Sequence, residues 1–226
     1  MESANPFDAN RFAAEIAGRF GARPAPNTAA ARAIRREFSR RLKGEEPVAI
    51  VGVALRLLEP PTPVPRFVAY ELICHHRSAL ASLDARQLEK LAAGMDNWGD
   101  VDAFACFLSG PAWRQRQLAD GVVYRWVRSD DPWWRRAALV STVPLNNKTR
   151  GGGGDARRTL AICRLLLEDR DDMVVKAMSW ALRELAKPDP KVVAAFLRDN
   201  ESRLAARVVR EVRNKLRTGL KNPRKT

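Results

Sequence analysis

A repeat with a period of 40 residues limits the possible folds of this chain more than any other feature. Asp131-Pro-Trp-Trp-Arg-Arg-Ala-Ala-Leu139 aligns with Asp171-Asp-Met-Val-Val-Lys-Ala-Met-Ser179, and in both segments an aspartate precedes a basic residue by five positions. Periods of this length are typical of helix pairs that stack side by side, because one pair cannot bury its apolar face alone. The repeat therefore predicts a solenoid of stacked helix pairs with a concave surface.

Apolar residues recur at helical spacing along nearly the whole chain, whereas strand-like runs are short. We predict an all-α fold, an α-solenoid of HEAT-like helix pairs with a concave basic face, in a single domain over residues 1–217. A flexible loop is expected at about residues 146–154, and a basic, disordered tail at 218–226. The predicted helices are Phe7–Phe20, Asn27–Lys43, Pro47–Glu59, Pro63–His76, Asp84–Met95, Asn97–Leu108, Pro111–Arg128, Asp131–Thr142, Asp155–Glu168, Asp171–Lys187, Pro190–Arg198 and Ser202–Arg217.

The charge balance indicates a polyanionic partner. The chain has 40 Lys and Arg residues against 26 Asp and Glu residues, a formal net charge of +14. Such a surplus destabilises a compact state by self-repulsion, and nucleic acid is the partner that most often accounts for it. A membrane surface is the weaker alternative, since no apolar run is long enough to span a bilayer and the N-terminus lacks the pattern of a signal peptide. We expect a cytoplasmic, nucleoid-associated monomer without a membrane partner.

The sequence offers no metal or cofactor site. Cys74, Cys106 and Cys163 are far apart and form no C-x-x-C pair, so buried free thiols are expected. His75 and His76 are adjacent, so they cannot face one metal ion from a single helix turn. We therefore predict neither a metal nor an organic cofactor.

A tryptophan and an unexplained carboxylate stand together in Met95-Asp-Asn-Trp-Gly-Asp-Val-Asp-Ala-Phe104. Asn97 is a suitable N-cap, and Asp100 then complements the exposed N–H groups of the first helical turn. Asp102 lies beyond that turn, so capping does not account for it. Trp98 and Asp102 are four residues apart and share one helix face.

The remaining tryptophans and basic residues are ambiguous from the pattern alone. Trp113 and Trp126 are expected in the core on one helix, and one of the adjacent pair Trp133 and Trp134 is expected to pack between repeats. Trp180 suits either the core or a site. In the repeat register Asp102, Arg136 and Lys176 occupy comparable positions in successive units. In the glycine-rich loop, Lys148 and Arg150 are candidate phosphate contacts.

Three ordered blocks carry a resemblance to a known family: "NWGDVDAF", "DPWWRRAALV" and "VVKAMSWALRELAK". Together they resemble the DNA alkylation repair family of AlkD-type glycosylases, whose pattern is Trp-x-x-x-Asp, then Arg-Ala-Ala-Ile/Leu, then Lys-Ala-x-x-Trp-x-Leu-Arg-Glu. The blocks occur in the family's order, with similar gaps, and the resemblance extends over roughly residues 30–215. It also implies a HEAT-like architecture.

The resemblance implies a role for individual residues. Asp102 matches the catalytic carboxylate, and Trp98 and Trp180 match aromatic walls of the DNA cleft. Arg136 matches a contact to a phosphate or to the DNA backbone, with Arg135 as its solvated or phosphate-facing neighbour. The family's N-terminal aromatic residue is a tyrosine, and its best match here is Phe38, which keeps the ring without the hydroxyl.

These residue types suit base excision repair of alkylated DNA. Alkylation at N7 of guanine or N3 of adenine makes the base cationic, so the N-glycosidic bond is weakened and positive charge develops on the deoxyribose as it breaks. A carboxylate stabilises that charge, indole faces attract cations, and arginine binds phosphate. The expected activity is a monofunctional DNA glycosylase acting on alkylated purines in duplex DNA.

Two other classes of protein, and another role for Asp102, stay open. A catalytically silent HEAT-like protein that recognises damaged or branched DNA has the same repeats and charge, and a protein–protein adaptor has the repeats only. Asp102 itself can pair with an arginine that packs between repeats, because ion-pair networks also gather charged side chains.

Overall fold

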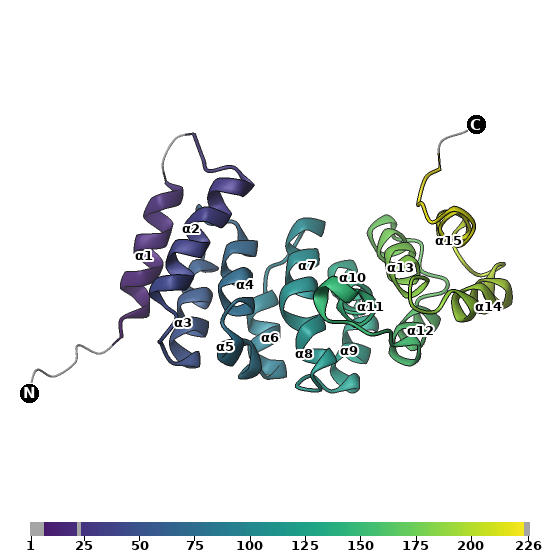
Figure 1. Ribbon diagram of the computed structural model, residues 1–226, viewed down its shortest axis with the longest axis horizontal. Helices are drawn as coiled ribbons and strands as arrows, with labels where there is room; N and C mark the ends of the chain where they lie inside the picture. Colours follow the sequence, from purple (N-terminus) through teal and green to yellow (C-terminus); the bar gives the residue numbers. More distant parts are fainter. Residues whose placement is uncertain (1–6, 22–23, 224–226) are drawn as a thin grey trace, which may run out of the picture. The chain divides into compact units, whose positions relative to one another are not determined.

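The computed structural model describes residues 7–21 and 24–223, and within these ranges every regular element is a helix (Figure 1). The predicted all-α fold is therefore confirmed. The chain divides into two compact units, residues 1–93 and 94–226. None of the described helices combines the length and apolar character that a membrane crossing requires.

The described residues of unit 1 form six helices, and α3 is central among them because it contacts α1, α4, α5 and α6. A buried carboxylate crosslinks two of the others, since Glu71 on α4 accepts hydrogen bonds from Arg32 (2.9 Å) and Arg35 (3.2 Å) on α2. The helices of unit 1 are α1 (Ala9–Phe20), α2 (Thr28–Arg41), α3 (Pro47–Leu57), α4 (Arg66–Cys74), α5 (Arg77–Ala81) and α6 (Ala85–Ala92).

In unit 2, the helices form two rows of the kind expected for stacked pairs. Helices α7, α10, α13 and α15 contact one another in that order, and α9, α12 and α14 contact them from the other row. The α-helices of unit 2 are α7 (Trp98–Phe104), α8 (Gly110–Arg114), α9 (Asp120–Val127), α10 (Pro132–Val140), α11 (Val143–Asn146), α12 (Ala156–Leu165), α13 (Asp172–Leu185), α14 (Pro190–Asn200) and α15 (Ala206–Thr218). A π-helical turn, η1 (Ala105–Ser109), joins α7 to α8, and a 3₁₀ turn, η2 (Lys148–Arg150), follows α11.

The 40-residue repeat corresponds to equivalent helix starts. Asp131 caps α10 by accepting a hydrogen bond from the backbone N–H of Trp133 at 2.9 Å, and Asp171 caps α13 by accepting one from Met173 at 2.8 Å. Each aspartate satisfies an N–H group that the first helical turn leaves free. The two segments that align in the sequence are thus the N-termini of neighbouring helices in one row.

One predicted helix is wrong. The segment Pro111–Arg128 forms two helices, because α8 ends at Arg114 and α9 begins at Asp120. Arg116 between them has a φ of 63°, a left-handed conformation that a continuous helix excludes. Trp113 and Trp126 are therefore on different helices, although both are buried as expected.

The segment predicted as a flexible loop is bound to the helices beside it. The side chain of Asn146 accepts a hydrogen bond from the backbone N–H of Asp155 at 2.8 Å, and the N–H of Gly154 donates to the carbonyl of Leu145 at 3.0 Å. Gly152 is buried against Leu145. The loop is therefore a hydrogen-bonded turn, and its flexibility stays a prediction.

The chain after α15 turns back on that helix. Gly219 ends α15 with a left-handed φ of 75°, and Lys221 places its ammonium 3.5 Å from the carboxylate of Glu211. The tail predicted to be disordered over 218–226 thus contacts α15 through Gly219 and Lys221, and its disorder stays a prediction. Residues 224–226 lie outside the described part of the chain.

Candidate functional site

Helix α7 begins at the tryptophan and aspartate segment as the sequence predicts. Asn97 is the N-cap, its Oδ1 accepts a hydrogen bond from the backbone N–H of Asp100 at 3.1 Å, and its Nδ2 donates to the Asp100 carboxylate at 2.8 Å. Asp100 thus belongs to the helix start. Asp102 has no part in this cap, and its side chain is directed to another helix.

Asp102 is held in a fork by Arg136 of α10. Nε of Arg136 donates to Oδ1 of Asp102 at 2.9 Å, and Nη2 donates to Oδ2 at 2.8 Å. The remaining Nη1 of Arg136 donates to the carbonyl of Met173 on α13 at 2.6 Å. Three helices of one row therefore fix the orientation of a single carboxylate.

The two partners differ in their exposure. The side chain of Arg136 is 6% exposed, whereas that of Asp102 is 18% exposed, so only Asp102 keeps an appreciable part of its side chain at the surface. Burial raises the pKa of Asp102, and the two hydrogen bonds from Arg136 limit that rise. The DNA contact predicted for Arg136 stays a prediction, and it would require the buried guanidinium to share or leave these partners.

Trp98 and Trp180 are the aromatic candidates. Trp98 is 61% exposed, which is unusual for a tryptophan, and it lies one turn before Asp102 on the same face of α7. Trp180 is half-buried on α13, two turns beyond the Met173 carbonyl that Arg136 contacts. The structure thus leaves part of both indoles available, one on α7, which carries Asp102, and one on α13, whose Met173 carbonyl Arg136 contacts.

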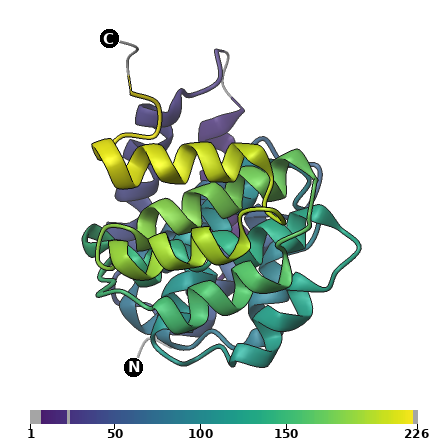
Figure 2. The ribbon, with the colours of Figure 1, turned by 90° about the vertical axis from the view of Figure 1, so that its right-hand side faces the viewer.

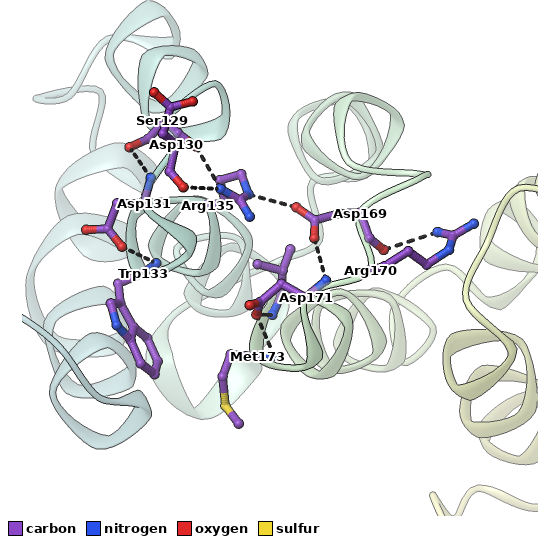
Figure 3. A network of polar contacts seen from close by, with 10 residues as sticks. Ser129, Asp130, Asp131, Trp133, Arg135, Asp169, Arg170, Asp171 and Met173 are labelled. Atoms are coloured by element: carbon purple, nitrogen blue, oxygen red, sulfur yellow. Dashed lines mark hydrogen bonds and ion pairs between the residues drawn. The ribbon is translucent and has the colours of Figure 1, made fainter.

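Arg135 is enclosed in a separate polar network (Figure 3). Its Nε donates to the carboxylate of Asp169 at 2.7 Å, and its Nη1 donates to the carbonyls of Ser129 at 2.9 Å and Asp130 at 2.8 Å. A phosphate contact would require Arg135 to leave these partners. Arg135 therefore links the start of α10 to the segment before α13.

The three other basic candidates are in different situations. Lys176 is half-exposed and pairs with Asp172 at 2.6 Å, one turn earlier on α13. Arg150 donates to the carbonyl of Cys106 at 3.3 Å, and its guanidinium lies 5.4 Å from the centre of the Phe107 ring. Lys148 is exposed. Lys148 is thus the most accessible cation of the three.

Phe38, which was predicted to be an aromatic residue of the site, is buried. The residue is 2% exposed in α2, and the guanidinium of Arg41 lies 4.7 Å from its ring centre. Its ring belongs to the core of unit 1, so it offers no surface to a DNA strand. The spacing of "REFSRR" had suggested a site aromatic, but the same spacing places Phe38 on the apolar face of α2 together with Ala31 and Ile34.

The adjacent tryptophans divide as expected, and one adds a candidate that the sequence did not single out. Trp134 packs against Trp126 and Phe104, with ring centres 5.2 and 6.4 Å apart. Trp133 is half-buried, and Figure 3 shows its indole directed away from Arg135 and Asp169. Trp133 precedes Arg136 by one turn on α10, and it is therefore a third aromatic candidate.

Metal ligands and a reactive thiol were sought among the described residues near Asp102. No group of three or more His, Cys, Asp and Glu side chains there is arranged to hold a metal ion. Cys106 lies one turn beyond Asp102, but its burial raises the thiol pKa to about 12, so it is not a nucleophile at neutral pH. The chemistry available is that of a fixed carboxylate beside aromatic rings.

The sequence matches the profile of the DNA alkylation repair enzyme family over residues 4–216. The chain belongs to this family. A comparison with curated proteins gave no match. Membership makes DNA repair the role of the protein and DNA its substrate, and the resemblance drawn from the three sequence blocks is confirmed.

Proposed function

We propose that this member of the DNA alkylation repair family is a monofunctional DNA glycosylase that excises cationic alkylated purines, such as N7-alkylguanine and N3-alkyladenine, from duplex DNA. The observation that carries the proposal is the partly exposed Asp102 carboxylate, fixed by both Nε and Nη2 of Arg136. The protein would act as a monomer in the cytoplasm, near the nucleoid, without a metal or an organic cofactor.

The proposed reaction is a hydrolysis in which the site stabilises the positive charge that develops on the sugar. The bond between C1′ and the base nitrogen breaks, its electron pair neutralises the cationic base, and positive charge develops on the sugar. Water then adds to C1′ and releases a proton, which leaves an abasic site. A carboxylate that is already oriented stabilises such a charge without reorganisation. Indole faces attract the cationic base through the ring quadrupole.

Arg136 has a positioning role in this proposal. Its fork holds both oxygens of Asp102, and its third contact, to the Met173 carbonyl, prevents the guanidinium from turning. Burial raises the pKa of Asp102, and Arg136 opposes that rise because it favours the charged form of the neighbouring carboxylate. Arginine suits this task better than lysine, since only its planar fork binds both oxygens.

The direct test is base release from duplex DNA that contains one N7-methylguanine, measured under single-turnover conditions at saturating protein. Time-dependent release of the free base supports the proposal. Tight, lesion-dependent binding without release would reject it.

A second candidate is a non-catalytic protein that binds damaged or branched DNA, and one observation favours it. Arg135 and Asp169 form a closed ion pair with the same separation of 34 residues as Asp102 and Arg136. An Asp–Arg pair between successive helices is therefore also a packing device in this molecule. The excision assay separates the two candidates, because a packing pair predicts binding without turnover.

A further inference from the structure

An exposed carboxylate at the start of α13 holds two cations that come from different helices. Nζ of Lys176, one turn later on α13, lies 2.6 Å from Oδ2 of Asp172, and Nη1 of Arg207 on α15 lies 3.4 Å from Oδ1. The two helices lie side by side, with α15 in yellow and α13 in green (Figure 2). Each oxygen of the carboxylate thus has one cation beside it, and the cluster of three keeps a surplus of one positive charge.

These ion pairs can be exchanged for a ligand. The side chains of Asp172, Lys176 and Arg207 are 56%, 40% and 38% exposed. Water and salt screen such pairs, so they contribute little to stability. The pair of Asp102 and Arg136 differs, because its side chains are only 18% and 6% exposed. An anion from solution therefore reaches Lys176 and Arg207 without breaking a buried contact.

The cluster lies on the stripe of α13 that the neighbouring helices leave uncovered. The residues of α13 that are not buried are Asp172, Met173, Lys176, Trp180 and Arg183. From Met173 onward they are three or four residues apart, so they share one helix face. Lys176 is therefore between the Met173 carbonyl, to which Arg136 donates, and the half-buried Trp180. The cluster thus borders the residues of the candidate site.

Helix capping does not account for Asp172. The N-cap is Asp171, whose Oδ1 accepts a hydrogen bond from the backbone N–H of Met173 at 2.8 Å. An acidic residue in the first turn complements the helix dipole, but that role does not need Arg207 of another helix. The hydrogen bond from Lys176 holds the pKa of Asp172 below its ordinary value, so the carboxylate is charged at neutral pH.

We propose that Lys176 and Arg207 form a clamp for one phosphate of the DNA backbone, and that Asp172 is an internal competitor for this clamp. A phosphate presents two oxygens as the carboxylate does, so it can take over both cations, and the guanidinium of Arg207 suits it. DNA must first displace Asp172, which weakens binding whether the base is damaged or not. The position of the clamp beside the lesion rests on the proposed function, whereas the clamp itself requires only a DNA substrate.

The test is a fluorescence titration of undamaged duplex DNA with the full-length protein at about 0.15 M salt, where charges more than about 8 Å apart are largely screened. The competitor variant is Asp172→Asn. The matched control is Glu168→Gln, which removes the charge of a 67% exposed side chain and releases its partner Arg203, 2.8 Å away. Asp172→Asn is also combined with Lys176→Gln/Arg207→Gln, which lacks the clamp. Melting curves establish that each variant is folded.

We expect Asp172→Asn to bind DNA at least about threefold more tightly, the scale of exposed ion pairs, and Glu168→Gln to stay within about 1.5-fold of the wild type. Lys176→Gln/Arg207→Gln should bind more weakly, with a salt slope shallower by about 0.9, because one phosphate contact is lost. In that background Asp172→Asn should change the affinity by less than about 1.5-fold, because its effect depends on the two cations.

Equal gains in Asp172→Asn and Glu168→Gln would overturn the proposal, since they would reflect net charge alone. A gain that persists without Lys176 and Arg207 would overturn it as well. So would unchanged or weaker binding by Asp172→Asn, which would leave this residue only its role at the helix dipole. The titrations involve no base release, so they can fail while the glycosylase proposal holds, and the excision assay can fail while the clamp holds.

Discussion

Two aspartates in the first turns of α7 have the same chemistry and different partners. Asp100 is bound by the Asn97 cap, and Asp102 by Arg136. We expect Asp102→Asn to slow single-turnover excision of N7-methylguanine by about 10²-fold, the scale for loss of one preorganised electrostatic group. Asp100→Asn should retain near-normal excision and cost about 0.5–1 kcal/mol of stability. Slower excision in Asp100→Asn than in Asp102→Asn would contradict the assignment.

Asp102→Asn also leaves the buried Arg136 without its counter-charge, which alone is expected to cost about 3–5 kcal/mol of folding free energy. The double variant Asp102→Asn/Arg136→Gln removes both charges and therefore separates stability from chemistry. It should recover much of the lost melting temperature and none of the excision rate. Recovery of excision together with stability would mean that Asp102 serves only packing.

The pH dependence of excision should report the Asp102 carboxyl. Because burial raises its pKa above the ordinary value, protonation begins at a higher pH than for an exposed aspartate, and the rate should fall as the pH drops through that raised pKa. Arg136→Gln removes the group that limits the rise. The acid limb of the single-turnover profile should therefore move to higher pH in this variant, and an unmoved limb would count against Asp102 as the titrating group.

The exposed and the buried tryptophans allow a matched comparison. Trp98→Ala should change stability by less than about 0.5 kcal/mol, because the indole is 61% exposed, and should still reduce excision. Trp113→Ala should instead cost about 3–5 kcal/mol, because that residue is 0% exposed. Its surviving folded fraction should excise normally. Melting curves and excision rates for both variants test whether Trp98 acts in excision and Trp113 in core packing.

At the residue scale, the sequence predicted where Asp102 stands but not what it contacts. The Trp-x-x-x-Asp spacing located the carboxylate, and capping logic correctly separated it from Asp100. Whether Arg136 reaches Asp102 depends on how α10 packs against α7. No local sequence pattern encodes the distance between these two helices. The same limit explains Phe38, whose helical spacing suits a core position and a site position equally.

At the scale of elements, the repeat was visible because each helix start needs a local cap, and Asp131 and Asp171 supply it in the sequence itself. The break in the predicted helix Pro111–Arg128 was not visible, since a left-handed Arg116 has no sequence signature comparable to that of glycine. The turn after α11 was predicted as flexible from its glycines. The structure shows close backbone packing in this turn, which composition does not reveal.

Two neighbouring glycines of this turn test that packing. An ideal Cβ on Gly152 would lie 2.5 Å from the carbonyl carbon of Leu145, whereas one on Gly153 would meet nothing within 4 Å. We expect Gly152→Ala to destabilise the protein by about 1–3 kcal/mol through overpacking. Gly153→Ala should stay within about 0.5 kcal/mol of the wild type. Equal melting temperatures would show that the turn yields freely.

At the scale of the whole molecule, the net charge of +14 does not stabilise the fold, but it favours binding of the polyanionic DNA substrate. Much of this charge is engaged internally, as the contacts of Arg135, Arg136 and Arg150 show. The cations left for DNA are therefore fewer than the composition suggests, and they must be identified from exposure.

Salt dependence measures how many of these cations bind phosphate. Each phosphate contact with duplex DNA contributes a slope of about −0.9 in log affinity against log salt. Lys148 is exposed, whereas Arg150 is bound to the Cys106 carbonyl and the Phe107 ring. We expect a steep slope for the wild type and a slope shallower by about 0.9 for Lys148→Gln, without loss of stability. For Arg150→Gln we expect an unchanged slope and a lower melting temperature.

These slopes are measured by fluorescence titrations of duplex DNA at several salt concentrations. An affinity that does not respond to salt would remove the electrostatic basis of DNA binding, and a shallower slope in Arg150→Gln alone would exchange the roles of the two residues.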